Sequence, residues 1–150
     1  MILNDHSSDQ LMTLIDTSRN TINNSWCMEG FAHHQFLLVD RPGFAISQEA
    51  EETPFSAGDV IFVAAGRCFG IRCGGEMNIH HIAFTGKNIR PLLHYCRFGE
   101  FRITSPSDEN YAEQAFEAIY SLSGEKKSAA KDIIISEKLY SLLAYLGGEN

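Results

Sequence analysis

Two pairs of adjacent histidines, His33-His34 and His80-His81, are the residues of this chain best suited to metal or acid–base chemistry. Both pairs lie in segments whose apolar and β-branched composition predicts strands. Neighbouring residues of a strand point to opposite faces of a sheet, so the two members of one pair cannot bind the same ion. One histidine from each pair could still meet across a sheet. We therefore expect no metal site and no bound cofactor.

Four cysteines, at positions 27, 68, 73 and 96, are the candidate nucleophiles. Their spacing is irregular and contains no C-x-x-C pair, which is unlike a disulfide scaffold. Cys68 or Cys73 could pair with His80 or His81, but the sequence offers no third orienting group and no oxyanion turn. No glycine motif for binding phosphate stands between a strand and a helix. We predict that the cysteines are buried structural residues and that the chain is not an enzyme.

Composition narrows the class of protein further. A chain of 150 residues with 44% hydrophobic and 21% charged residues fits one soluble domain that can bury a core without disulfides. The net charge is −7 and the 12 basic residues are scattered, so the chain by itself should not bind nucleic acid. No apolar run approaches the roughly 20 residues that span a bilayer, and the N-terminus lacks a signal-peptide pattern. We expect a cytoplasmic protein without a membrane partner.

Residues 25–86 have the pattern of a small antiparallel β-barrel. The clearest part is residues 52–69, which read as a strand, a Gly58-Asp59 turn, a β-branched strand and an Ala64-Ala65-Gly66 turn. Short strands with turn residues between them are typical of a barrel or sandwich. The predicted strands are residues 26–28, 33–39, 44–47, 53–55, 60–63, 68–72 and 77–84, with further turns at 41–43 and 74–76.

The two ends of the chain have different patterns. Residues 1–24 form a polar arm in which Ser7 and Gln10 have capping-box spacing, which predicts a short helix beginning near Leu11. In residues 87–150 the apolar period becomes 3.6. This period predicts a short helix over 88–98 interrupted at Pro91, a longer one that starts at Ser105-Pro106 and ends at 123–125, and another from about 128 to 147. Two helices joined by a short polar loop form an antiparallel hairpin.

The last predicted helix carries an apolar stripe with spacings of four and three residues. Such a stripe can pack within its own chain, or it can form the seam between two chains. We predict a two-fold homodimer through this stripe. Its residues are Ile135, Leu139, Leu142, Leu143 and Leu146.

A barrel followed by a helix pair resembles the sensor domain of AraC-family transcription regulators, over about residues 35–146. The matching signs are FLLV before the Arg41-Pro42-Gly43 turn, the run GDVIFVAAG and the strand IHHIAFTG, although Ala64 and Ala65 stand where prolines are usual. The resemblance implies a mainly β fold, with a cupin-like jelly-roll barrel and C-terminal helices. It also implies a small-molecule effector, often a sugar, and a separate C-terminal helix-turn-helix module through which alone DNA is bound.

By match to the cavity-facing positions of that family, six residues would line the pocket: His33, Gln35, Phe69, Ile71, Ile79 and His81. Such a surface suits a small, uncharged and polar organic ligand. Metal-binding cupins carry a His-x-His pair and a later histidine, whereas this chain has no histidine in residues 43–46 and has Phe69 at the last place. We predict the effector-sensing and dimerisation domain of a regulator. The alternatives are a stand-alone cupin enzyme, of isomerase or dioxygenase type, and a scaffold without a ligand.

Overall fold

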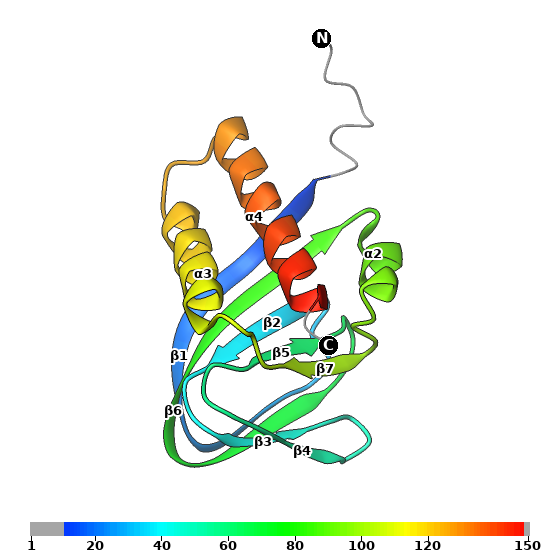
Figure 1. Cartoon of the computed structure of the whole chain (residues 1–150), viewed down its shortest axis with the longest axis vertical. Coiled ribbons are helices and arrows are strands. Elements are labelled where there is room, and N and C mark those ends of the chain that lie inside the picture. Colours follow the sequence, from blue (N-terminus) through cyan, green and yellow to red (C-terminus); the bar gives the residue numbers. More distant parts are fainter. Residues whose placement is uncertain (1–10, 149–150) are drawn as a thin grey trace.

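One long strand, β6 (Phe69–Gly86), connects most of the sheet. It pairs with β1 (Met12–Met28) along one edge, and along the other edge with β3 (Gly43–Ile46) and then β2 (His34–Val39). Beyond these, β4 (Glu52–Phe55) pairs with β3, while β5 (Val60–Val63) pairs with β2 and with β7 (Phe101–Thr104). All pairings are antiparallel, and the sheet curls into a nearly closed barrel (Figure 1). This computed structural model describes residues 11–148.

Each predicted strand overlaps an observed one, but the turn predicted at residues 74–76 lies inside β6. At this point the register between β1 and β6 shifts, and the Gly75 N–H donates to Asn24 Oδ1 at 3.0 Å. Gly75 has φ +97°, a conformation that side chains other than glycine rarely adopt. Gly74 and Gly75 therefore form a bulge, at which β6 changes its neighbour from β3 to β2.

The first strand corrects the helix predicted near Leu11. Residues 12–28 form β1, and Met12 lies opposite Gly86 of β6. Pairing with the long free edge of β6 outweighs a local capping signal, because propensity is weak against tertiary context. Ser7 and Gln10 lie outside the described residues. The barrel consequently begins near Met12, within the predicted arm of residues 1–24.

Three helices follow or interrupt the later strands. Pro91 lies in the first turn of α2 (Ile89–Tyr95), where no helical N–H is needed, so it does not break the helix. The cap of α3 (Glu109–Ser123) is Asp108, which accepts from two backbone N–H groups, rather than Ser105. The last helix, α4 (Ala129–Gly148), begins after Ser128 as predicted. Side by side, α3 and α4 form the predicted hairpin over one face of the sheet (Figure 1), and the predicted fold class is confirmed.

Both faces of the central strands are buried, in two separate cores. On β2, Phe36 and Leu38 face the helices, while Leu37 and Val39 face the barrel interior. Alternate residues of a strand point to opposite faces, so a strand covered on both sides is apolar throughout. This explains why all six residues of β2 are buried.

The apolar stripe of α4 belongs to the core on the helix side. Its five residues are at most 5% exposed and pack in the cluster formed by α3, α4 and the outer face of the sheet. Side chains that are buried inside their own chain cannot be the contact with a second copy. The predicted dimer interface of Ile135, Leu139, Leu142, Leu143 and Leu146 is therefore wrong. The same spacing is produced by a helix that packs on its own domain.

The predicted Gly58-Asp59 turn is held by a buried carboxylate. Asp59 Oδ2 accepts from the Ser56 N–H and Asp59 Oδ1 from the Ser105 hydroxyl, each at 2.8 Å. Asp59→Ala should leave both donors without a partner and lower the free energy of unfolding by about 1–3 kcal/mol. Urea denaturation measures this loss. The exposed control Glu51→Ala should stay within about 0.5 kcal/mol of wild type, and equal losses in the two variants would contradict the assignment.

Candidate functional site in the barrel

Two polar side chains meet inside the barrel. Leu37 of β2 lies opposite His81 of β6, which puts Gln35 on the same face of the sheet, two residues away. His81 Nε2 lies 2.7 Å from Gln35 Oε1. Since a carboxamide oxygen only accepts, the imidazole Nε2–H is the donor. Both side chains are buried, and Gln35 is 0% exposed.

The other end of the Gln35 amide has no partner. Its Nε2 is buried and makes no hydrogen bond with residues 11–148. Burying an amide donor without a partner costs about 1–3 kcal/mol. A water or a bound molecule with an acceptor atom would supply the missing hydrogen bond, so this amide is a candidate contact for a ligand in the barrel.

A cavity of about 450 Å³ opens beside His81. This volume is in the range of small-molecule sites. Aromatic side chains form part of the wall, Leu37 and Ile79 supply apolar surface, and polar side chains of β1 line the remainder. The lining residues are Asp16, Ser18, Asn20, Thr21, Ile22, Trp26, Met28, Phe31, Leu37, Ile79 and His81.

The six predicted ligand residues do not all reach this cavity. Ile79 and His81 line it, and Gln35 is bonded to His81. Phe69 and Ile71 lie in the apolar cluster of the barrel interior, but they border a different depression of about 680 Å³ between β1, β3 and β6. His33 is half-buried with its ring 5.7 Å from that of Phe31, outside the cavity lining. The ligand roles of all six remain predictions.

The contribution of β1 to the cavity was not predicted from the sequence. Asp16, Ser18, Asn20 and Ile22 all line the cavity, and they recur at every second position of the chain. This period of two is a strand signal. The signal is weak here because three of the four residues are polar, a composition that a polar arm shares.

Two hydrogen bonds hold the Ala64-Ala65-Gly66 turn against the beginning of β2 and the residues before it. The Gly66 N–H donates to the carbonyl of Phe31 at 2.7 Å, and the Phe31 ring stacks on His81 with centroids 6.2 Å apart. The Ala65 N–H donates to His34 Nδ1 at 3.0 Å. A proline has no N–H to donate. Because position 65 is an alanine and not a proline, its N–H allows His34 to anchor this turn.

The adjacent histidines point to opposite faces, as predicted. The His80 ring lies on the helix side beside Phe116 and Tyr120, with centroid distances of 5.3 and 5.5 Å, while His81 is inside the barrel. Within residues 11–148, no three His, Cys, Asp or Glu side chains are grouped so that they could hold a metal ion.

The four cysteines are free, and their predicted burial is only partly observed. Cys27 is exposed, so the prediction is wrong for this residue, and the other three are partly buried.

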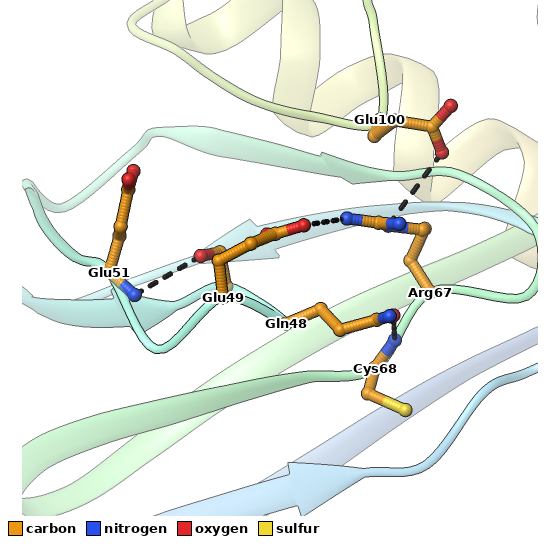
Figure 2. Close-up of polar contacts among 7 residues, drawn as sticks. Gln48, Glu49, Glu51, Arg67, Cys68 and Glu100 are labelled. Carbon is orange, nitrogen blue, oxygen red and sulfur yellow. Dashed lines mark hydrogen bonds and ion pairs between the residues drawn. The ribbon is translucent and has the colours of Figure 1, made fainter.

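Arginines near the barrel are engaged by carboxylates. Arg67 binds Glu49 and also lies 3.7 Å from Glu100, as Figure 2 shows. The same figure shows Gln48 Oε1 accepting from the Cys68 N–H at 3.0 Å. These contacts connect the loop between β3 and β4 to the start of β6. Arg72 pairs with Glu52 in the same way.

Burial lowers the pKa of three histidines. Desolvation is the largest cause for His34, His80 and His81, and the nearby Arg19 adds to the effect at His80, whose pKa falls to about 4. The folded protein therefore binds fewer protons than the unfolded chain, in which a histidine titrates near 6.5. The stability that neutral burial provides is complete above pH 6.5. It is lost as the pH falls toward the folded pKa.

We therefore expect the free energy of unfolding to decrease from pH 7 to pH 5. Each histidine contributes at most about 1.4 kcal/mol per pH unit. Urea denaturation at several pH values measures the slope. His80→Leu should flatten it, whereas His94→Leu, at an exposed histidine of α2, should leave it unchanged. A slope that responds to His94 and not to His80 would contradict this account.

Comparisons with known proteins show a likeness of fold only. No protein-family model matches the chain, and no curated protein matches it in sequence. Solved structures of ToxT from Vibrio cholerae are similar, one of them at a TM-score of 0.54 and 8% identity over 91% of this chain and 56% of that chain. This chain thus spans little more than half the length of ToxT.

Two further ToxT structures contain bound molecules. One is ToxT from Vibrio cholerae O395 bound to (E)-4-(8-methylnaphthalen-1-yl)but-3-enoic acid, with a TM-score of 0.53, 10% identity and coverage of 91% and 58% of the two chains. The other is wild-type ToxT from strain SCE256 with bound unsaturated fatty acid, with a TM-score of 0.52, 7% identity and coverage of 91% and 55%.

None of the helices in residues 11–148 has the length and apolar character needed to cross a bilayer.

Proposed function

We propose that this chain is the effector-sensing domain of an AraC-type transcription regulator and that it binds a small organic ligand in the barrel cavity. ToxT, whose fold it shares, is an AraC-family regulator. The observation that carries the proposal is the buried Gln35–His81 pair, because His81 lines a 450 Å³ cavity and the Gln35 amide bonded to it keeps one donor without a partner. We propose a cytoplasmic location and DNA contact through a helix-turn-helix module outside this chain. Nothing in the described residues favours the enzyme alternative.

The first strand connects the cavity to the last helix. β1 lines the cavity from Asp16 to Met28, and at its start the Met12 N–H donates to Ser136 Oγ of α4 at 2.8 Å, in a buried contact. Arg19, also on β1, pairs with Glu117 of α3. A ligand that shifts β1 would therefore change the position of the helical hairpin, provided that it binds the two arrangements with different affinities.

The predicted homodimer requires a surface other than the buried stripe. The outer face of α4 exposes Ile133, Ile134 and Tyr140, at 40, 42 and 37%. We propose that a second copy packs on this face in a two-fold arrangement. Ile133→Glu with Ile134→Glu should give a folded monomer in light scattering. A monomeric mass for the unmodified protein would already contradict the proposal.

Trp26 makes the function directly testable. It is the only tryptophan of the chain and it lines the cavity. A thermal-shift screen of sugars, amines, alcohols and small acids should return a ligand that stabilises the protein by about 2.7 kcal/mol at 100 times its Kd. The same ligand should change the Trp26 fluorescence.

The Gln35→Leu variant tests the amide. It removes the open donor, and we expect the ligand to bind at least about tenfold more weakly, a loss of about 1.4 kcal/mol. Gln114→Leu, at an exposed glutamine of α3, is the matched control and should not alter the affinity. Ligands that bind with unchanged Trp26 fluorescence and unchanged affinity for Gln35→Leu would rule out the barrel as the site.

A further inference from the structure

We propose that the barrel cavity selects ligands with a positively charged ammonium group over carboxylates of the same size. This inference rests on the proposed function and specifies its ligand class. The proposed ammonium ligand differs from the uncharged ligand expected from the sequence.

The charge of the cavity is negative. Of its lining residues only Asp16 is charged, and this exposed side chain makes no hydrogen bond or ion pair with any residue in the described range. Its charge acts on the cavity, because the Asp16 carboxylate opposes the lowering of the His81 pKa that burial causes. A free carboxylate at the rim of a cleft attracts cations and repels anions.

The cavity walls also suit a cation. Trp26 and Phe31 present aromatic rings, and a cation over the face of such a ring is stabilised by about 0.5–2 kcal/mol. Trp26 is held edge-on against Phe69, with centroids 5.4 Å apart. Phe31 is held by its stack on His81. Two ring positions are therefore fixed before a ligand arrives.

Acceptors for ammonium hydrogen bonds lie along β1. Asn20 Nδ2 donates to Ser18 Oγ at 2.9 Å, so the carbonyl oxygen of the Asn20 side chain remains available as an acceptor. The Asp16 carboxylate is the second acceptor. An ammonium group carries three donors and no acceptor, which matches this set, whereas the open Gln35 amide would bind an acceptor atom elsewhere on the same ligand.

A carboxylate would find no cationic partner in the cavity. No lysine or arginine of the described chain lines it, and Arg67 and Arg72 at the barrel ends are paired with glutamates. The molecules bound in the ToxT structures include a butenoic acid and a fatty acid. The charge of the cavity in this chain therefore disfavours acids such as those bound in the ToxT structures.

The test compares three probes of one size: benzylamine, benzoate and benzyl alcohol. Their Kd values are measured by calorimetry and by Trp26 fluorescence at pH 7.5. We expect benzylamine to bind at least tenfold more tightly than benzoate. Asp16→Asn should remove most of this difference, and circular dichroism checks that the variant is folded. Glu113→Gln makes the same charge change at an exposed position of α3, outside the cavity, and should preserve the difference.

The outcomes separate the two proposals. Benzoate binding as tightly as benzylamine, or a preference that survives Asp16→Asn, overturns the ammonium inference and leaves the sensing function in place. If none of the three probes binds, the charge of the molecules returned by the wider screen decides: amines support the inference, and acids or sugars overturn it. A screen that returns no ligand overturns the sensing function itself.

Discussion

Leu142→Glu should unfold this protein at 25 °C, whereas Ile134→Glu, eight residues earlier on the same helix, should leave it folded. Leu142 is 0% exposed in the core between α4, α3 and the sheet, while Ile134 is 42% exposed. Truncation of a buried leucine to alanine costs about 2–5 kcal/mol, and a buried unpaired charge costs more. Since small domains are stable by about 5–15 kcal/mol, the glutamate should exceed or nearly exhaust the available stability.

Far-UV circular dichroism and urea denaturation measure this difference. Leu142→Ala provides a variant that stays folded and should lose about 2–5 kcal/mol. If Leu142→Glu instead remained folded, with only its mass in light scattering changed, the stripe would be a seam between chains. The intrachain core described above would then be wrong.

Ser18→Trp should abolish ligand binding without unfolding the protein. Ser18 points into the cavity from β1, so an indole at this position fills the space that the ligand needs. We expect the Kd of the best ligand from the screen to rise at least about 100-fold, a loss of about 2.8 kcal/mol. Calorimetry measures the Kd, because the added tryptophan complicates fluorescence. Asn23→Trp, at an exposed position of the same strand outside the cavity, is the control.

An unchanged Kd in Ser18→Trp would show that the ligand binds elsewhere. Loss of binding in both tryptophan variants would point to damage of β1 as a whole and would likewise contradict a specific role of the cavity.

Strands whose ends are marked by turn residues were predictable from the sequence. The segment Val60–Val63 has the predicted bounds, because β-branched and aromatic residues lie between two turns with glycine. The beginning of α4 was predictable for a similar reason, since Ser128 accepts from the Lys131 N–H at the helix terminus. In both cases, residues adjacent in the sequence determine where the element begins or ends.

Elements that depend on distant partners were not predictable. β1 is polar over much of its length and exists because β6 offers a long edge, and the short strand Phe101–Thr104 was missed since it is defined by its pairing with β5. The α4 stripe shows the same limit. Periodicity identifies the apolar face of a helix but not the surface that covers it.

The candidate site was predictable in part. The resemblance and the period of two led to Gln35 and His81, which the structure places in contact. The half of the cavity formed by β1, including Asp16, required the strand pairing and hence the three-dimensional structure.

The central claim is that the ligand is bound inside the barrel, and an NMR titration tests it most directly. Amide spectra of 15N-labelled protein, recorded with and without the best ligand from the screen, should change most at the Trp26 indole N–H and at the backbone of Leu37, Ile79 and His81. A second depression of about 430 Å³ lies outside the barrel, near Arg19, His80 and Glu113. Changes confined to the residues of that depression, or distributed over the whole surface, would contradict the claim.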